Sequence, residues 1–271
     1  MPELPEAQSI AAAMQIGLAG GEIRQVRLLR RDFLKTGTPG RLAELAGRKV
    51  ASVGRKGKYV ILEIPPLRLV LQLGMSGRVY LVAAGQQPEP HTHLVLTLAG
   101  GREMHYANAR RIASGVHVLS PGQDGPLAAL GEDALTISAQ DFAQGLSARR
   151  CAIKTALMNQ RLLAGVGNIY SDEALFRAGL RPSRRASGIS RPKLLALHTA
   201  LRAVLAEAIR AGGSTIKGAN PYASAGGELG EFTTAHRIYG RYGQPCLRCG
   251  QTCRRKTLGG RTSTFCPHCQ K

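Results

Sequence analysis

The chain begins Met1-Pro2-Glu3-Leu4-Pro5-Glu6, which places a potential nucleophile beside a carboxylate. Once Met1 is removed, as a small second residue normally allows, Pro2 is a free secondary amine. An α-amino group titrates near about 7.7 to 8.0, against about 10.4 for a lysine side chain, so part of it is unprotonated at neutral pH. Such an amine can attack an aldehyde-like carbon and form an iminium while Glu3 carries a proton. The alternative is that Pro2 and Pro5 only stiffen the approach to a helix.

A metal-binding pattern lies near the other end of the sequence. Two C-x2-C pairs are separated by sixteen residues, and their members are Cys246, Cys249, Cys266 and Cys269. This spacing offers four thiolates to one ion and is typical of a closed tetrahedral zinc site, so we expect one structural zinc and no organic cofactor. With so little core, the short hairpin between the pairs depends on the metal for folding. Cys253 and His268 do not fit the paired spacing, and we interpret Cys151 as a core residue at a helix start.

Composition favours a nucleic-acid partner. The 271 residues include 37 Lys and Arg but only 17 Asp and Glu, a net charge of +20, with the excess spread along the chain. Such a surface attracts polyanions. No apolar run approaches the roughly 20 residues that span a bilayer, and no signal-peptide pattern is present. We therefore expect a cytoplasmic, nucleoid-associated monomer with no membrane partner.

Hydrophobic periodicity predicts an N-terminal helix followed by a β-rich region. Residues 5–19 have an apolar face, a proline start and a glycine stop. Short β-rich runs then follow at 23–29, 49–53, 59–64, 67–73, 79–82, 94–98, 103–106 and 116–119. Gly and Pro punctuate these runs, which favours an antiparallel sandwich or barrel ending at a linker over 121–131.

The remaining pattern is helical. Ser138 and Asp141 form a capping box, and helices are predicted over 153–163, 168–178 and 190–211. Gly165-Val166-Gly167-Asn168 is typical of a tight turn that ends in an N-cap residue. If the N-terminal amides of the following helix are exposed, this turn forms a phosphate site, and otherwise it belongs to an ordinary helical hairpin. Residues 212–230 look like a mobile glycine-rich loop. We expect domains at 1–130, 131–235 and 236–271.

Four motifs occur in an order that resembles one family over essentially the whole chain. They are the Met-Pro-Glu-Leu-Pro-Glu start, Leu73-Gly74-Met75-Ser76-Gly77, Gly165-Val166-Gly167-Asn168-Ile169-Tyr170 and the four-cysteine tail. Together they resemble formamidopyrimidine-DNA glycosylase. The resemblance implies an α+β multidomain fold: an antiparallel β-sandwich with an N-terminal helix, a helix-two-turns-helix domain and a β-hairpin zinc finger. It also implies removal of oxidised purines from double-stranded DNA, followed by strand cleavage.

The resemblance also assigns roles to individual residues. The catalytic set is Pro2, Glu3, Lys58 and Arg261, with Pro2 as nucleophile, Glu3 as proton carrier, Lys58 beside the lesion phosphate and Arg261 chiefly as a phosphate clamp. The DNA-contact set is Met75, His91, Arg110, Ile112, Arg149, Lys154 and Asn168. Met75 and Arg110 match residues that fill the space of the extruded nucleotide and pair the orphaned base.

The chain departs from the family where Asp-Pro-Arg-Arg-Phe is usual and Asn108-Ala109-Arg110-Arg111-Ile112 is present. The aromatic wedge is thus replaced by Ile112, which can be inserted but cannot stack on a base. The sequence leaves three alternative functions open: an endonuclease VIII-type enzyme for pyrimidine lesions, a non-catalytic DNA-binding protein of the same fold, and a basic RNA-binding zinc protein.

Overall fold

A computed structural model describes residues 2–214 and 230–271. The chain divides into two compact units, residues 1–128 with 211–231 and residues 129–210 with 232–271. The expected loop at 212–230 lies mostly outside the described residues. Among those residues, no helix is both long enough and apolar enough to cross a membrane.

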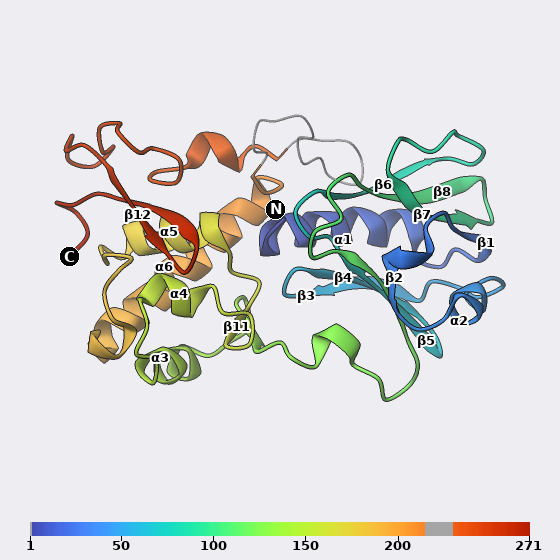
Figure 1. Cartoon of the computed structure of the whole chain (residues 1–271), viewed down its shortest axis with the longest axis horizontal. Helices are drawn as coiled ribbons and strands as arrows, with labels where there is room; N and C mark the ends of the chain where they lie inside the picture. Colours follow the sequence, from blue (N-terminus) through green and yellow to red (C-terminus); the bar gives the residue numbers. More distant parts are fainter. Residues whose placement is uncertain (1, 215–229) are drawn as a thin grey trace. The chain divides into compact units, whose positions relative to one another are not determined.

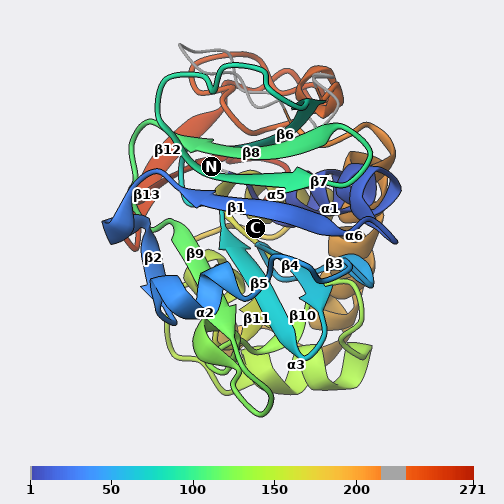
Figure 2. The ribbon, with the colours of Figure 1, turned by 90° about the vertical axis from the view of Figure 1, so that its right-hand side faces the viewer.

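The first unit begins with helix α1 (Leu4–Leu18), close to the predicted range. Pro5 lies in the first turn of the helix. The helix ends shortly before Gly20, whose φ is +79°. The predicted apolar face is confirmed, since Ile10, Met14 and Leu18 are buried. Figures 1 and 2 show α1 at one side of the sandwich, where it packs on strands of both sheets.

Two β-sheets face each other in this unit (Figure 2). One has the order β1-β7-β8-β6, with β1 Ile23–Leu28, β6 Gly77–Ala83, β7 Thr92–Leu98 and β8 Arg102–Asn108. The other has the order β2-β9-β5-β4-β3, with β2 Leu34–Thr36, β3 Ser52–Lys56, β4 Tyr59–Ile64, β5 Leu67–Gln72 and β9 Gly115–Leu119. Alternate residues such as Val60, Leu62 and Ile64 fill the shared core.

The sandwich differs from the prediction in two places. β2 pairs with β9 in parallel, so the second sheet is not wholly antiparallel. The strand expected at 49–53 begins only at Ser52, because Val50 bonds instead to Gly20 and Gly21 at the end of α1. The short helix α2 (Pro39–Ala43) joins β2 to β3.

The second unit contains the helices α3 (Ala139–Ser147), α4 (Ile153–Leu157), α5 (Asn168–Arg177) and α6 (Arg191–Arg210). Ser138 caps α3 as predicted, since its Oγ accepts a hydrogen bond from the Asp141 amide at 3.1 Å. The helix expected over 153–163 is wrong in length. The helix α4 ends at Leu157, and the chain turns there and enters β11 (Leu163–Ala164). This strand pairs in parallel with β10 (Glu132–Asp133).

The same unit ends in the hairpin of β12 (Arg254–Leu258) and β13 (Arg261–Phe265), as predicted. Single 3-10 turns in the chain cover Arg31–Phe33, Gly125–Leu127, Ala186–Gly188 and Phe232–Ala235. Cys151 is exposed, so its interpretation as a core residue is wrong.

Candidate active site and nucleic-acid interface

The described chain starts with buried residues. Pro2 is buried, and Glu3, the N-cap residue of α1, is only 2% exposed. The Glu3 amide donates a hydrogen bond of 2.7 Å to Oε2 of Glu6, one turn into the helix. The candidate nucleophile and proton carrier are therefore held in one place by the start of α1.

Glu6 also binds a distant part of the same unit. Its other oxygen, Oε1, accepts a hydrogen bond of 2.7 Å from the Ser214 amide. Gly213 passes so close that a Cβ there would lie 2.8 Å from Oε1, and its φ of +87° favours glycine. Motif reading does not single out Glu6, although it is buried and uses each carboxylate oxygen for a backbone amide.

Lys58 lies at the tip of the β3–β4 hairpin. Lys56 pairs with Tyr59, so the turn contains only Gly57 and Lys58, and Gly57 has the positive φ (+58°) that such a turn needs. Arg55 braces the turn through its Nε to Gln8 Oε1 (2.8 Å) and its Nη1 to the Gly57 carbonyl (3.2 Å). Because Gln8 lies in α1, the hairpin carrying Lys58 is bonded to the helix that positions Glu3.

Two loops bring Met75, Arg110 and Ile112 into one region. Gly74 has a φ of +60°, and a methyl group on it would collide with the carbonyl oxygens of Ile112 and Ala113. The backbone before Met75 thus lies directly against the second loop. Ile112 is 56% exposed, and Arg110 is also exposed.

His91 precedes β7 and is exposed, with a φ of +67°. Such a conformation is uncommon for a residue other than glycine. The first unit therefore places Met75, His91, Arg110 and Ile112 on loops at the ends of the strands β5 to β9.

In the second unit, Asn168 is the first residue of α5, with Gly167 as the N-cap. The sequence predicted Asn168 as the N-cap, which is one residue later than the N-cap in the structure. The Asn168 Oδ1 is buried and has no hydrogen-bond partner among the described residues. An amide at a helix N-terminus can donate to a phosphate, and the helix dipole favours the negative charge. Arg149 is exposed just after α3.

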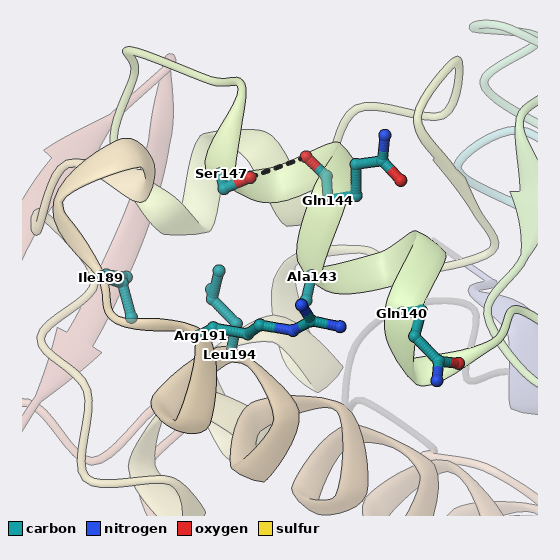
Figure 3. Close-up of a pocket in the computed structure, with 7 residues that line it drawn as sticks. All are labelled: Gln140, Ala143, Gln144, Ser147, Ile189, Arg191 and Leu194. Carbon is teal, nitrogen blue, oxygen red and sulfur yellow. Dashed lines mark hydrogen bonds between the residues drawn. The ribbon is translucent and has the colours of Figure 1, made fainter.

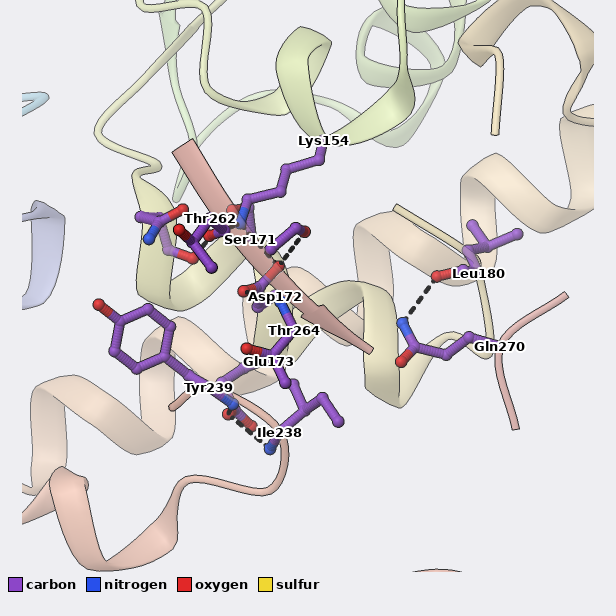
Figure 4. Close-up of polar contacts among 12 residues, drawn as sticks. Lys154, Ser171, Asp172, Glu173, Leu180, Ile238, Tyr239, Thr262, Thr264 and Gln270 are labelled. Atoms are coloured by element: carbon purple, nitrogen blue, oxygen red, sulfur yellow. Dashed lines mark hydrogen bonds and ion pairs between the residues drawn. The ribbon is translucent and has the colours of Figure 1, made fainter. Parts of the chain in front are cut away.

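Lys154 does not lie where the resemblance implied. Its side chain is fully buried, with Nζ 2.8 Å from Oδ1 of Asp172 and 3.1 Å from the Thr262 carbonyl (Figure 4). Asp172 in turn accepts hydrogen bonds from the Ser263 hydroxyl (2.8 Å) and the Thr264 amide (3.1 Å). The charge of Lys154 is therefore taken up inside the unit, and the expected contact with the DNA backbone does not fit this placement.

That buried cluster lies directly behind Arg261. The hairpin turns through Gly259 and Gly260, with φ values of +54° and +72°, and Arg261 follows as the first residue of β13. Two successive positive φ values are typical of a tight hairpin turn. Arg261 is thus exposed at the tip of a hairpin whose next residues are bonded to Lys154 and Asp172.

Glu173 fixes the segment that enters the zinc-binding region. Its carboxylate accepts hydrogen bonds of 2.8 to 3.1 Å from the successive amides of Arg237, Ile238 and Tyr239 (Figure 4). The side chain is buried in α5 next to Asp172. No sequence motif identified this role.

The predicted zinc ligands converge. The Sγ atoms of Cys246, Cys249, Cys266 and Cys269 lie within 4.8 Å of one another. A tetrahedral zinc with bonds of about 2.3 Å requires sulfurs about 3.8 Å apart, so the donor set fits one ion. The Arg248 amide donates to Cys246 Sγ and the Cys269 amide to Cys266 Sγ, each at 3.4 Å, which stabilises the thiolates. Cys253 is buried nearby but does not belong to the cluster.

A separate pocket of about 270 Å³ lies between α3 and the start of α6 (Figure 3). Gln140, Gln144, Ser147 and Arg191 supply its polar lining. None of the predicted site residues lines it.

Comparison with known proteins gives concordant matches. Residues 1–114 match the formamidopyrimidine-DNA glycosylase N-terminal domain, residues 130–220 its H2TH domain, and residues 243–271 the zinc finger found in FPG and IleRS. The formamidopyrimidine-DNA glycosylase of Solibacter usitatus is 40% identical over 279 residues, covering 100% of both chains. That of Bacillus subtilis is 34% identical, covering 100% of this chain and 99% of the relative.

Solved structures agree with these matches. The MutM (Fpg) protein from Thermus thermophilus superimposes with a TM-score of 0.88 at 35% identity, covering 99% of this chain and 98% of that one. A Lactococcus lactis FPG mutant in complex with DNA containing Fapy-dG gives a TM-score of 0.91 at 29% identity, covering 100% of both chains.

Proposed function

The chain belongs to the formamidopyrimidine-DNA glycosylase family, and from that premise we propose that it removes oxidised purines from duplex DNA through a Pro2 Schiff base and then cleaves the strand. The observation that carries the proposal is the buried Pro2-Glu3 start, held by the bond from the Glu3 amide to Glu6. The solved relative bound to DNA containing Fapy-dG supports the substrate class.

In the proposed reaction, the Pro2 nitrogen attacks the sugar C1′ of an extruded nucleotide. The glycosidic bond breaks, and the base leaves with the bonding electrons and takes up the proton that the Pro2 nitrogen loses. Glu3 protonates the ring oxygen as the sugar opens, so the Pro2 nitrogen and C1′ form an iminium. The iminium makes the C2′ proton acidic, and its removal expels the 3′ phosphate. Loss of the C4′ proton from the resulting unsaturated iminium then expels the 5′ phosphate in a second elimination.

Lys58 and Arg261 have supporting roles in this proposal. The ammonium of Lys58, at the tip of its hairpin, exchanges protons near the lesion phosphate. The guanidinium of Arg261 is a permanent cation with a planar fork of donors, so it clamps the phosphate rather than acting as an acid. Asn168 donates to a neighbouring phosphate. Cys246, Cys249, Cys266 and Cys269 would bind the structural zinc, which would stabilise the hairpin that presents Arg261.

We propose the domains as 1–130 for the catalytic sandwich, 131–235 for the helix-two-turns-helix domain and 236–271 for the zinc finger, although residues 211–231 pack with the sandwich in the first compact unit. The partner is double-stranded damaged DNA, and the net charge of +20 supports its capture.

Reductive trapping tests the chemistry. Borohydride should link the protein covalently to duplexes carrying a single 8-oxoguanine or formamidopyrimidine, and mass spectrometry should place the adduct on Pro2. Pro2→Gly, which retains a terminal amine of altered reactivity, should trap more slowly, and a retained N-terminal tag should abolish trapping. Pro5→Ala is the matched control, because Pro5 has no free amine. An adduct on a lysine, or undiminished trapping by the tagged protein, would refute the assignment.

The same assay separates the alternatives. A duplex carrying an oxidised pyrimidine should react more slowly than the purine lesions. A reversed order indicates an endonuclease VIII-type enzyme, and failure to trap on any lesion indicates a DNA-binding protein without catalysis.

A further inference from the structure

Asn108, at the end of β8, is 1% exposed and uses its backbone to bind the start of β7. Its amide donates a hydrogen bond of 2.9 Å to the carbonyl of His91. Its own carbonyl lies 2.9 Å from Nε2 of His93, which must be the donor because a carbonyl only accepts. Asn108 in β8 therefore holds the backbone of His91, an expected DNA contact, through a hydrogen bond.

The side chain of Asn108 binds the other two candidate DNA-contacting loops. Its Oδ1 accepts hydrogen bonds from the Ser76 hydroxyl (2.7 Å) and the Arg111 amide (2.8 Å), and its Nδ2 donates to the Leu73 carbonyl (3.0 Å). The Ser76 oxygen also accepts a hydrogen bond from the Arg110 amide at 3.0 Å. Leu73 and Ser76 flank Met75 in the chain, so one carboxamide joins the loop of Met75 to the loop of Arg110.

Backbone strain is concentrated around this residue. In the described ranges, the residues other than glycine with positive φ are His91 (+67°), Arg111 (+54°) and Ala113 (+48°). Each costs roughly 1 to 2 kcal/mol, and such conformations persist only where the surroundings over-determine them. Two of the three are hydrogen-bonded directly to Asn108. Asn108 therefore holds the loops in conformations that they would not adopt alone.

We infer that Asn108 is a positioning residue that makes Met75, His91 and Arg110 a single unit, so that space filling, backbone contact and reading of the orphaned base occur together. The inference rests on the proposed function. The carboxamide accepts from Ser76 and Arg111 and donates to Leu73. An ionised carboxylate, the family's usual group at this position, keeps the acceptor side but cannot donate to Leu73, and an alkyl group can do neither.

Asn108→Leu tests this inference, because it keeps the volume and removes the side-chain hydrogen bonds to Ser76, Arg111 and Leu73. Single-turnover base removal should be measured with each of the four bases opposite the lesion, and strand cleavage on a single-stranded abasic oligonucleotide. Base removal from duplex should slow by about tenfold more than single-strand cleavage. The preference among opposite bases should shrink toward equality, because Arg110 is no longer held in place. Asn108→Asp keeps the acceptor for Ser76 and Arg111 and should retain most of that preference.

Two further variants keep the test decisive. Ser76→Ala removes the hydroxyl shared by both loops and should reproduce the loss of preference even if Asn108→Leu does not fold. Thr97→Val removes a 2.9 Å hydrogen bond to Glu103 in the same sheet. This control should change neither the ratio of duplex base removal to single-strand cleavage nor the preference among opposite bases. If the unmodified protein is active and Asn108→Leu or Ser76→Ala retains its opposite-base preference, the inference fails while the proposed function stands. If the unmodified protein removes no lesion, the proposed function fails first.

Discussion

The ammonium of Lys154 lies 2.8 Å from Oδ1 of Asp172, and both side chains are fully buried. Burial raises the pKa of Asp172 to about 6, although the charge of Lys154 opposes the shift, so the carboxyl is ionised at neutral pH. The pair joins α4 and α5 to the hairpin residues that follow Arg261. It is therefore a structural link behind a candidate functional residue.

Breaking this pair from one side should be costly. Lys154→Met leaves a buried carboxylate without its counter-charge and should lower the free energy of unfolding by about 3 to 5 kcal/mol. The double variant Lys154→Met/Asp172→Leu should recover most of that loss. Denaturant unfolding measures both, and amide exchange at Thr264 reports the hairpin. Arg177→Met, which breaks the partly exposed pair with Glu207, is the control and should cost only about 0 to 1 kcal/mol. Equal costs for the two single variants would show that the buried pair has no special role.

Gly213→Ala should disturb the amino end from a distance. The new methyl group would press on Glu6 Oε1, displace its bonds to Ser214 and Glu3, and slow borohydride trapping about tenfold. Gly212→Ala is the matched control. It has a similar φ of +70°, but its nearest neighbour would be 3.6 Å away, so it bears the same backbone strain without the collision. If both variants trap at the same reduced rate, strain alone explains the effect.

Ile112→Phe should separate binding from chemistry. An aromatic ring can stack on a base, which is worth about 1 to 3 kcal/mol, so binding to intact duplex should tighten and sliding should slow. Cleavage of a pre-formed abasic site should change far less, because Pro2 and Glu3 lie at the start of α1 and not in this loop. Arg110→Ala should impair base removal instead, since the orphaned base loses its charged donor. Equal changes in binding and abasic-site cleavage after Ile112→Phe would show that the loop shapes the reaction pocket.

Metal content should depend on the four clustered cysteines alone. Cys249→Ala should lose the zinc, unfold the last ~35 residues and weaken DNA binding, while the sandwich stays folded. Cys253→Ala should retain one zinc per chain in elemental analysis. Full metal content in the first variant, or metal loss in the second, would change the ligand set.

Acid should destabilise the first unit partly through His117. Burial lowers the pKa of His117 to about 4, with the charge of Lys35 as a second cause. Above the ordinary pKa of 6.5 the imidazole is neutral in both states. Below it the unfolded chain takes up the proton first, so stability falls as the pH drops from 6.5 toward 4. His117→Gln should make that slope shallower by about one proton in denaturant unfolding at several pH values. An unchanged slope would mean that other groups cause the acid sensitivity.

Local patterns predicted much of the fold. The apolar face of α1, the alternation in β4, the Ser138 cap and the paired cysteines each depend on residues close in sequence, and all were readable. The helix expected over 153–163 failed because periodicity alone did not reveal that Leu163 pairs with Glu132 in a strand.

The polar network could not be read in the same way. Four buried side chains each make at least one hydrogen bond to a backbone atom far along the chain: Glu6, Asn108, Asp172 and Glu173. A backbone amide has no sequence signature, so no motif identifies its partner. Lys154 shows the same limit, because the resemblance places it among the DNA contacts while its partner Asp172 has no sequence signature that marks the lysine as buried.

The bond between Glu6 and Ser214 also affects the order of events during synthesis, because 208 positions separate its two residues. The amino end leaves the ribosome first, yet it reaches its bonded form only after more than three quarters of the chain has been translated. Nascent and prematurely terminated chains therefore carry the amine and its carboxylate without the arrangement that holds them.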